Sequence, residues 1–391
     1  MSKVLIIGCG GVASVAIHKC CQVPEVFTEI CIASRTKAKC DKLAAELAPT
    51  TTTKITTAQV DADKVEEVIA LIKAYQPDLV MNIALPYQDL TIMDACLACG
   101  VNYMDTANYE PENTDDPEWR AIYEKRCKEA GFSAYFDYSW LWAYAKKHEF
   151  DTIDTLDILD CNGGDHGYAF ATNFNPEINL REVSAPGSYW ENGHWVEIPA
   201  MSIKREYNFD QVGDKDMYLL HHEEIESLAK NIPEAKRIRF FMTFGQSYLD
   251  HMRCLEDVGM LSTTPVNFNG QEIVPIQFLK ALLPDPASLG PRTKGKTNIG
   301  CIFTGKKDGK DKTYYIYNVC DHQECYKEVG SQAISYTTGV PAMCGALMLL
   351  TGKWTTKGVH TVEEFDPDPY LDALDKYGLP RSESHNPALV D

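Results

Sequence analysis

The sequence predicts an α/β fold in two parts: a doubly wound parallel sheet in residues 1–145, followed by an α+β catalytic and dimerisation domain with a largely antiparallel sheet. Two observations support this prediction. Up to residue 110, short apolar strands alternate with amphipathic helical patterns, which is typical of a parallel sheet covered on both faces. From residue 152 onward, Asn-Gly and Asp-Gly pairs lie between apolar runs and indicate hairpins.

The first strand, Val4–Ile7, ends in a glycine-rich turn from which a helical pattern begins. The turn matches the pattern G-x-G-x-x-A in the strand–turn–helix context that binds a dinucleotide in a Rossmann-type domain. Gly8 permits the tight turn, Gly10 lets the backbone approach a pyrophosphate, and Ala13 permits close packing of the helix. The N–H groups at the helix start are available to phosphates. A glycine turn without a ligand is the alternative; the predicted contacts are Gly8, Gly10, Gly11, Val12 and Ala13.

The second strand, Ile30–Ala33, ends in Ser34-Arg35-Thr36. An NAD-binding domain usually has Asp or Glu about 20 residues past the glycine turn, on the ribose hydroxyls, and this chain has none there. A guanidinium between two hydroxyls suits the 2′-phosphate of NADP(H) instead. Ser34 is also a candidate cap of the following helix, and the two roles are compatible.

The alternation continues through strands at 55–60, 79–84 and 101–104, with helical patterns at 65–75 and 92–99 between them. Ligands of such sheets lie beyond the carboxyl ends of the strands. The segments 82–87 and 105–108 are therefore predicted to form the lip of a nicotinamide site, although capping is an equally weighted role for Asp105. The further cofactor contacts predicted at these strand ends are Asp61, Ala62, Asn82, Ala84, Leu85, Pro86, Tyr87, Asp105 and Thr106.

The second part opens with the strand Ile153–Cys161, which ends in the glycine-rich loop 162–167. Hairpin turns are predicted at Asn192-Gly193, Asn269-Gly270 and Asp308-Gly309. Helical patterns are found at 221–232, 247–257, 276–283 and 331–350, the last apolar nearly all round and therefore expected to be buried. We place the domain boundaries at 1–145, 146–328 and 329–391, with the last segment packing back on the first domain and the tail from Asp366 on the surface.

Composition excludes several classes of protein. The net charge of 37 − 56 = −19 disfavours nucleic acid as a partner. The apolar run Pro341–Leu350 falls short of the roughly 18 residues of a membrane span, and the N-terminus does not match a signal peptide. We therefore expect a cytoplasmic protein with reduced cysteines. No metal is predicted, since Cys96-x-x-Cys99 has no second ligand pair and His221–Glu224 is interpreted as a solvated helix start.

Longer motifs point to a family. The segments 82–90 and 100–110 resemble the saccharopine dehydrogenase-like family, and 157–167, 173–179, 289–300 and 331–341 resemble its carboxynorspermidine (carboxyspermidine) dehydrogenase branch. The resemblance covers nearly the whole chain. It implies NADPH-dependent reductive condensation of aspartate β-semialdehyde with a diamine, putrescine or 1,3-diaminopropane, in polyamine biosynthesis. It also implies a homodimer.

The resemblance further suggests which side chains hold the substrates. An α-carboxylate favours Arg, and a distal ammonium favours Asp or Glu. Arg239 and Arg292 are assigned to the first task and Asp165 and Glu177 to the second, with interdomain ion pairs as the alternative. His166, in the glycine-rich loop, has a structural hydrogen-bonding role as its alternative. The catalytic candidates are Cys161, Asp165, His166, Glu177, Arg239 and Arg292.

One departure from the family affects the activity expected of the chain. The family has a strand, a Gly-Phe-Asp-Pro-Gly turn and a helix before the strand at 153–161, but residues 132–162 contain neither Gly nor Pro. We therefore expect one helix through Phe132–Tyr144, a first domain with one strand fewer, and slow turnover. The alternatives are a saccharopine-type reductase with another aldehyde and amine, and a non-catalytic NADP-binding variant.

Overall fold

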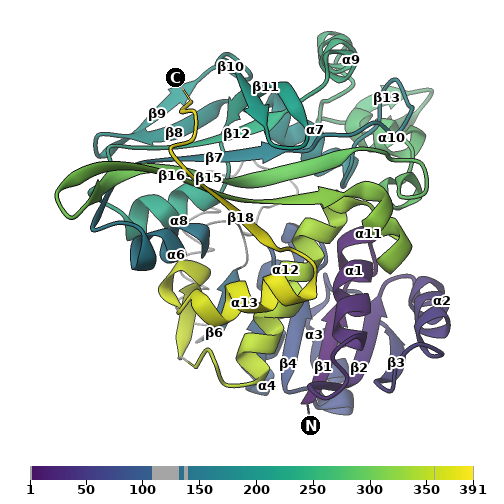
Figure 1. Ribbon diagram of the computed structural model, residues 1–391. Coiled ribbons are helices and arrows are strands. Elements are labelled where there is room, and N and C mark those ends of the chain that lie inside the picture. The colour runs from purple at the N-terminus through teal and green to yellow at the C-terminus, as the bar shows by residue number, and fades with distance from the viewer. Residues whose placement is uncertain (1, 108–131, 136–139, 356, 391) are drawn as a thin grey trace. The chain divides into compact units, whose positions relative to one another are not determined.

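The computed structural model describes residues 2–107, 132–135, 140–355 and 357–390. Its contacts divide the chain into two compact units (Figure 1). Unit 1 comprises Met1–Trp140 and Ser335–Gly378, and unit 2 comprises Leu141–Ile334 and Leu379–Asp391. The chain therefore passes from one unit to the other three times.

Unit 1 contains a five-stranded parallel sheet in the order β3-β2-β1-β4-β5. This order confirms the predicted doubly wound fold, because the chain direction across the sheet reverses between β1 and β4. Cofactors bind such sheets at the carboxyl ends of the strands beside that reversal. The strands are β1 (Ser2–Ile7), β2 (Phe27–Ser34), β3 (Lys54–Gln59), β4 (Leu79–Asn82) and β5 (Asn102–Met104).

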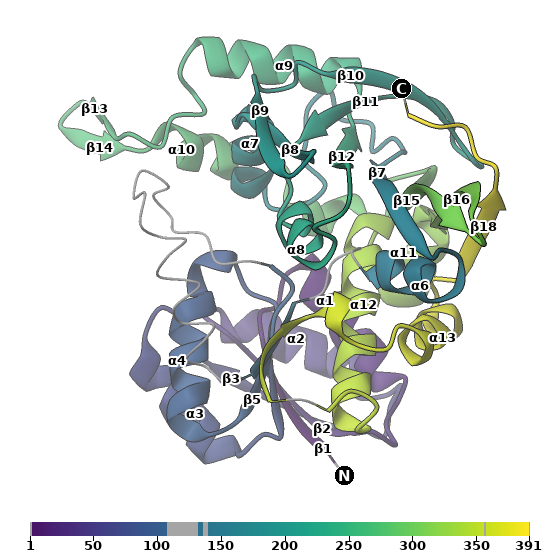
Figure 2. The same cartoon turned by 90° about the vertical axis from the view of Figure 1, so that its left-hand side faces the viewer.

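Four helices connect these strands, and α3 and α4 lie side by side on one face of the sheet (Figure 2). Val68 and Ile72 of α3 and Ile92 of α4 pack on Leu5 and Val80 of the sheet. Gly100 ends α4 in the left-handed conformation, as predicted. The helices are α1 (Gly11–Cys21), α2 (Lys37–Leu47), α3 (Val65–Tyr75) and α4 (Asp89–Cys99), with a short 3-10 turn, η1 (Pro86–Gln88), before α4.

The prediction of one helix through Phe132–Tyr144 is wrong. Residues Phe132–Tyr135 form a strand, β6, which pairs in parallel with β17 (Gly358–Thr361), and helix α6 begins at Trp140 and ends at His148. A strand and a helix are thus present where the family has them, and residues 136–139 between them lie outside the described residues. The sequence pattern could not indicate β6, because this strand depends on pairing with β17, more than 200 residues further along the chain.

The C-terminal segment belongs largely to the core of unit 1. Helix α12 (Ala333–Leu350) has 18 residues, the length and composition of a membrane span, yet 83% of it is buried inside the protein. The prediction of a surface tail from Asp366 is wrong, because α13 (Asp368–Tyr377) buries Tyr370, Leu371 and Leu374. The prolines at the start of α13 made the segment look like a loop, although proline is compatible with the first turn of a helix.

A buried lysine joins these helices to the first one. Lys19 of α1 is 1% exposed, and its Nζ donates hydrogen bonds to the Tyr336 hydroxyl on α12 and to the Tyr377 carbonyl at the end of α13, both at 2.7 Å. A cation at a helix C-terminus also opposes the negative end of the helix dipole. The C-terminal helices are therefore held to α1 by directional bonds as well as apolar packing.

Unit 2 is built on a nine-stranded sheet, largely antiparallel as predicted, in which only β7 and β12 pair in parallel among the described strands. The three hairpins are confirmed, with Asn192, Asn269 and Asp308 each at positive φ before a glycine. The long hairpin β15–β16 spans the sheet (Figure 1). The strands are β7 (Thr152–Cys161), β8 (Gly187–Glu191), β9 (His194–Ile198), β10 (Lys204–Phe209), β11 (Gly213–Leu220), β12 (Arg237–Thr243), β15 (Lys296–Lys307), β16 (Lys310–Asp321) and β18 (Arg381–His385); β13 (Val266–Phe268) and β14 (Gln271–Ile273) form a separate hairpin.

The two faces of this sheet differ in chemistry. Leu159 and Cys161 of β7 pack with Phe241 and Tyr315 in an apolar cluster. Side chains alternate along a strand, so Asp160 lies on the opposite face. The helices of unit 2 are α6, α7 (Pro176–Ser184), α8 (Glu224–Asn231), α9 (Gln246–Asp257), α10 (Pro275–Leu282) and α11 (His322–Val329).

Candidate cofactor and substrate sites

The glycine turn after β1 has the geometry of a dinucleotide cradle. Gly8 has φ +127, and a Cβ there would lie 2.2 Å from the carbonyl oxygen of Ile83. A Cβ at Gly10 would meet nothing within 4 Å, which leaves open space beside the backbone. Among the described residues no side chain caps the start of α1, and its first turn carries no acid. The N–H groups of that turn are therefore available to a pyrophosphate.

Helix α12 fixes the position of α1 at this turn. A Cβ at Gly11 would lie 2.8 Å from Oγ of Ser335, and one at Gly339 would lie 2.6 Å from Cβ of Val15. Ala13 is buried, as the close-packed third position of the pattern requires. Sequence reasoning missed Ser335 and Gly339, since a small residue in an apolar helix carries no signal of what it packs against.

The end of β2 presents an exposed guanidinium. Arg35 is held by one long ion pair, with Nη1 3.7 Å from Oδ2 of Asp63, and its side chain is 66% exposed. Ser34 Oγ accepts a hydrogen bond from the Thr36 N–H at 3.2 Å, while Thr36 itself occupies the N-cap position of α2. Ser34 thus shapes the turn and does not occupy the cap. The set fits a 2′-phosphate, because the hydroxyls and the guanidinium face a strand end that lacks a carboxylate.

The segments after β3 and β4 are linked to each other. Gln88 Nε2 donates to Asp63 at 2.8 Å, and its Oε1 accepts from the Leu85 N–H at 3.2 Å. Hydrogen bonding to Lys64 lowers the pKa of Asp61. The remaining predicted contacts here vary in burial: Ala62 is buried, and Ala84, Leu85, Pro86 and Tyr87 are half-buried.

Asn82 and Asp105 lie inside unit 1. Asn82 Nδ2 donates to Asp89 Oδ1 at 2.7 Å and to the Tyr103 hydroxyl at 2.9 Å. Burial raises the pKa of Asp105 to about 7. This network connects the ends of β4 and β5 to the start of α4. Asp89 was not predicted, because an acidic residue in the first turn of a helix is common and indicates no special role. Thr106 is half-buried, and Asn108 lies outside the described residues.

In unit 2, a buried histidine holds the glycine loop after β7. His322 Nε2 lies 2.7 Å from the Gly163 carbonyl, and its Nδ1 accepts from the Ala333 N–H at 3.2 Å. This pairing assigns the proton to Nε2, and burial lowers the pKa of the ring. A Cβ at Gly164 would lie 2.7 Å from the same ring, which explains the glycine. The sequence gives no motif around His322, so its role was missed.

The structure brings together three of the predicted catalytic residues on this loop. Asp165 Oδ1 accepts from the Gly167 N–H at 2.7 Å, and His166 Nδ1 accepts from the Tyr168 N–H at 3.1 Å. Burial lowers the pKa of His166. The exposed Arg292 guanidinium stacks 4.3 Å from the Tyr168 ring centroid. A neutral imidazole beside an exposed guanidinium can exchange a proton and bind a carboxylate.

The other three candidates have internal partners, although Cys161 directly precedes this loop. Arg239 is buried and makes a bidentate pair with Asp157, at 2.7 and 2.9 Å. Burial works to raise the pKa of Glu177, but hydrogen bonds, first that of Lys280 at 3.0 Å, hold the pKa below its usual value. Burial raises the pKa of Cys161 to about 11, on the apolar face. These contacts give all three a structural role.

The interpretation of His221–Glu224 as a solvated helix start is wrong. Helix α8 begins at Glu224, which is 2% exposed and pairs with His222, and the His222 ring stacks on Phe240 at 4.2 Å. These polar residues are buried because strand β12 places Phe240 against them, which their own sequence does not indicate. Within the described ranges, no group of three or more His, Cys, Asp or Glu side chains is placed to hold a metal ion.

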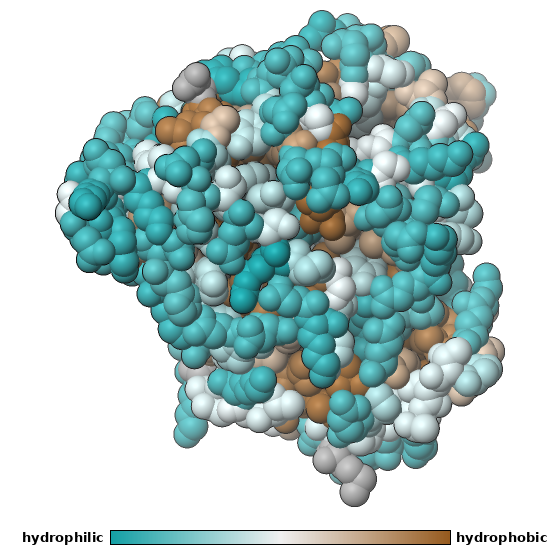
Figure 3. Space-filling model, in the orientation of Figure 1, coloured by the Kyte–Doolittle hydropathy of each residue, from teal (hydrophilic) through white to brown (hydrophobic). Residues whose placement is uncertain are grey.

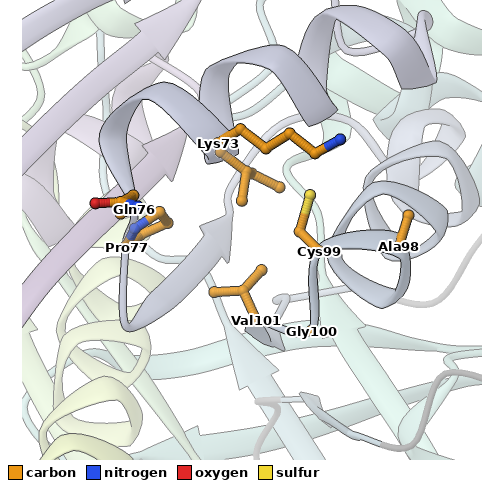
Figure 4. Close-up of a pocket in the computed structure, with 8 residues that line it drawn as sticks. Lys73, Gln76, Pro77, Ala98, Cys99, Gly100 and Val101 are labelled. Atoms are coloured by element: carbon orange, nitrogen blue, oxygen red, sulfur yellow. The ribbon is translucent and has the colours of Figure 1, made fainter.

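A shallow pocket of about 390 Å³ lies elsewhere in unit 1 (Figure 4). It is lined by Lys73 and Gln76 at the end of α3 and by Cys99 and Val101 around the end of α4. Helices in a parallel α/β sheet run opposite to the strands, so these ends lie at the amino edge of the sheet. That edge is the one away from the glycine turn, and the pocket is not part of the cofactor site.

Comparison with known proteins assigns the family. The model of the saccharopine dehydrogenase NADP binding domain matches residues 4–151, and that of the saccharopine dehydrogenase C-terminal domain matches residues 144–379. The chain belongs to the saccharopine dehydrogenase family. The resemblance of its motifs is thereby confirmed, and the cofactor is NADP(H), which agrees with the open Gly10 and with Arg35 in place of an acid.

Two curated relatives match nearly the full length. A carboxyaminopropylagmatine dehydrogenase of Synechocystis sp. is 53% identical over 395 residues, 99% of this chain and 98% of that protein. A carboxynorspermidine synthase of Vibrio alginolyticus is 43% identical, over 96% and 95% of the two chains. The chain is therefore an NADP-dependent oxidoreductase related to enzymes of polyamine biosynthesis.

A solved structure shares the fold. The apo saccharopine dehydrogenase (L-Glu forming) from Saccharomyces cerevisiae superposes with a TM-score of 0.69 over 99% of this chain and 100% of its own. The two sequences are only 14% identical, so the likeness establishes the architecture and not the substrate.

Proposed function

We propose that the protein condenses L-aspartate β-semialdehyde with an aliphatic primary amine that carries a second cation, and reduces the product with NADPH. The observation that carries this proposal is the pair of full-length relatives whose names both denote carboxylated aminopropyl amines. The exposed Arg292 beside the loop 163–167 supports it, because a guanidinium suits the α-carboxylate of the aldehyde substrate.

The chemistry needs few protein groups. The amine adds to the aldehyde carbon, and water leaves to give an imine. Bound NADPH supplies the hydride that reduces this imine. His166, whose Nδ1 accepts a hydrogen bond from the Tyr168 N–H, carries its proton on Nε2 and would donate a hydrogen bond to the departing oxygen, which leaves as water with the two protons that the amine nitrogen gives up. Arg292 would hold the carboxylate and so align the aldehyde carbon.

The names of the relatives favour one amine over the others. The relative at 53% identity is named for agmatine and the one at 43% for norspermidine. We therefore expect agmatine to be used best, ahead of the diamines putrescine and 1,3-diaminopropane. All three combine a primary amine with a distal cation.

The test is the oxidation of NADPH by the full chain with aspartate β-semialdehyde and each amine in turn, with the condensed product identified by mass. Omission of the aldehyde is the control for direct oxidation. Faster turnover with glutamate and another semialdehyde would assign a saccharopine-type reaction instead. NADPH binding without turnover would support the non-catalytic alternative.

The expectation of slow turnover depended on the missing Asp-Pro-Gly turn. Strand β6 and helix α6 lie on either side of residues 136–139, which are outside the described residues, and residues 132–162 contain neither Gly nor Pro. Slow turnover therefore stays a prediction, and turnover on the order of 1 per second or faster would contradict it.

We also propose a cytoplasmic homodimer. Exposed apolar side chains gather on the β13–β14 hairpin and on α10 of unit 2, and Figure 3 shows hydrophobic residues over this part of the surface. Exposed apolar patches commonly mark association sites. Sedimentation of the full chain should give a dimer that the double change Phe268→Asp and Phe278→Asp converts to a monomer. The exposed apolar residues of this patch are Val266 and Phe268 on the hairpin and Phe278 and Leu282 on α10.

A further inference from the structure

An acidic cluster on the sheet face opposite Cys161 is short of hydrogen-bond donors. It consists of Asp160 and Asn162 at the end of β7 with His222 and Glu224 before and at the start of α8. Glu224 Oε2, Asp160 Oδ1 and Asn162 Oδ1 are buried and accept no hydrogen bond from the described residues, and the cluster's own buried nitrogen, His222 Nδ1, makes no well-aligned hydrogen bond either, so three acceptors stand against one donor atom. Buried acceptors are normally satisfied, so three together indicate an unplaced donor.

The contacts show that these groups form one cluster. His222 Nδ1 lies 3.2 Å from Glu224 Oε1, and the His222 ring lies flat on Phe240 of β12. Asn162 hydrogen-bonds to Asp160, and the charges of His222 and Glu224 both act on Asp160. The Glu224 side chain is only 2% exposed, yet its Oε2 has no hydrogen-bond partner among the described residues.

The charge of the cluster shows which kind of donor is missing. Burial works to lower the pKa of His222, but Glu224 and then Glu223 raise it well above its usual value. The cluster thus sets one imidazole against the two carboxylates of Asp160 and Glu224. Burial raises the pKa of Asp160 to about 7. A second carboxylate in this setting gains most from a cation, because a water molecule would supply hydrogen bonds without charge.

We propose that Asp160, Asn162 and Glu224 form the subsite for the distal cation, ammonium or guanidinium, of the amine substrate. This inference rests on the proposed function. The cluster adjoins the loop 163–167 by chain continuity, since Asn162 directly precedes Gly163. The neighbouring side chains of His222 and Glu223 are partly exposed. We assign the distal cation to this cluster and not to Glu177, because the Glu177 carboxylate already accepts a hydrogen bond from Lys280.

The experiment compares putrescine with n-pentylamine, in which a methyl group stands in place of the far ammonium. Loss of a hydrogen bond to a charged group weakens binding about ten- to a hundredfold, so the native KM ratio of the two amines should be at least tenfold. Glu224→Gln should bring this ratio close to one. KM for aspartate β-semialdehyde and for NADPH should stay within twofold, which a general packing defect would not produce.

Asp160→Asn serves as the second variant if Glu224→Gln does not fold, as judged by circular dichroism. Glu272→Gln, on the exposed hairpin strand β14, is the matched control for the loss of one negative charge and should leave the ratio unchanged. Agmatine in place of putrescine tests the guanidinium in the same way. An unchanged KM ratio in a folded Glu224→Gln or Asp160→Asn variant would overturn the subsite and leave the proposed function standing.

Calorimetry separates the two proposals. Titration of agmatine and putrescine into the full chain should show binding that Glu224→Gln weakens at least tenfold. If the native chain turns over none of the amines but shows this Glu224-dependent binding, the subsite stands and the proposed function fails. Binding of n-pentylamine as tight as that of putrescine would overturn the subsite.

Discussion

Replacement of Arg35 by Ala tests the recognition of the 2′-phosphate. The Arg35 side chain is 66% exposed and forms an ion pair with Asp63 at 3.7 Å, an exposed pair worth less than about 1 kcal/mol to the fold. The substitution should therefore leave unfolding almost unchanged. A hydrogen bond to a charged group contributes about 1.5–3 kcal/mol, so NADPH should bind roughly ten- to a hundredfold more weakly. NADH, which lacks the phosphate, should bind as before.

The assay is fluorescence titration of both cofactors into the native chain and three variants. Lys42→Ala, which removes an exposed positive charge from α2, the helix that follows Arg35, is the matched control and should change NADPH affinity less than twofold. Asp63→Asn should tighten NADPH a few-fold, because Asp63 is a negative charge that competes for Arg35. Equal weakening of NADPH and NADH by Arg35→Ala would refute the 2′-phosphate role.

Further substitutions test other parts of the structure. Arg292→Ala should raise KM for aspartate β-semialdehyde at least tenfold with KM for the amine unchanged, as steady-state kinetics would show. Gly8→Ala should lower the melting temperature because its Cβ would meet the Ile83 carbonyl, whereas Gly10→Ala should keep the fold and lose only NADPH affinity. The folded pKa of Asp105 is about 7, above its unfolded value near 4. The neutral carboxyl therefore contributes stability at low pH that is lost as pH rises through 7. Asp105→Asn should melt at a higher temperature than the native chain at pH 8 but not at pH 4. Lys19→Met should lower the free energy of unfolding by about 1–3 kcal/mol in urea titrations, since it leaves the part-buried Tyr377 carbonyl with only the long hydrogen bond, 3.4 Å, from the Tyr336 hydroxyl.

Local features of the fold could be predicted from the sequence. The glycine turn after β1 and the Asn-Gly hairpins depend on residues next to one another, and the structure has them where the patterns lie. The pairing of β6 with β17 could not be predicted, because a strand of four residues is specified by its partner and not by its own letters.

Charged residues show the same limit at the site. Arg239 and Arg292 look alike in sequence, yet one forms a buried bidentate pair with Asp157 and the other is exposed on a tyrosine ring. Whether an arginine is free to bind a ligand depends on whether a neighbouring strand or helix places an acidic partner beside it. The His222–Glu224 pair was misjudged for the same reason, since only the position of Phe240 shows that the segment is buried.

The threefold passage of the chain between the units has a consequence for synthesis on the ribosome. When residues 1–140 have emerged, α1 lacks Ser335, Gly339 and Tyr336, and the buried ammonium of Lys19 has neither of its acceptors. Unit 2 in turn lacks the strand beside β16 until β18 has been synthesised. The nascent chain thus exposes apolar surface until residues 335–385 have emerged, and a chain that stops before residue 335 would leave both units unfinished.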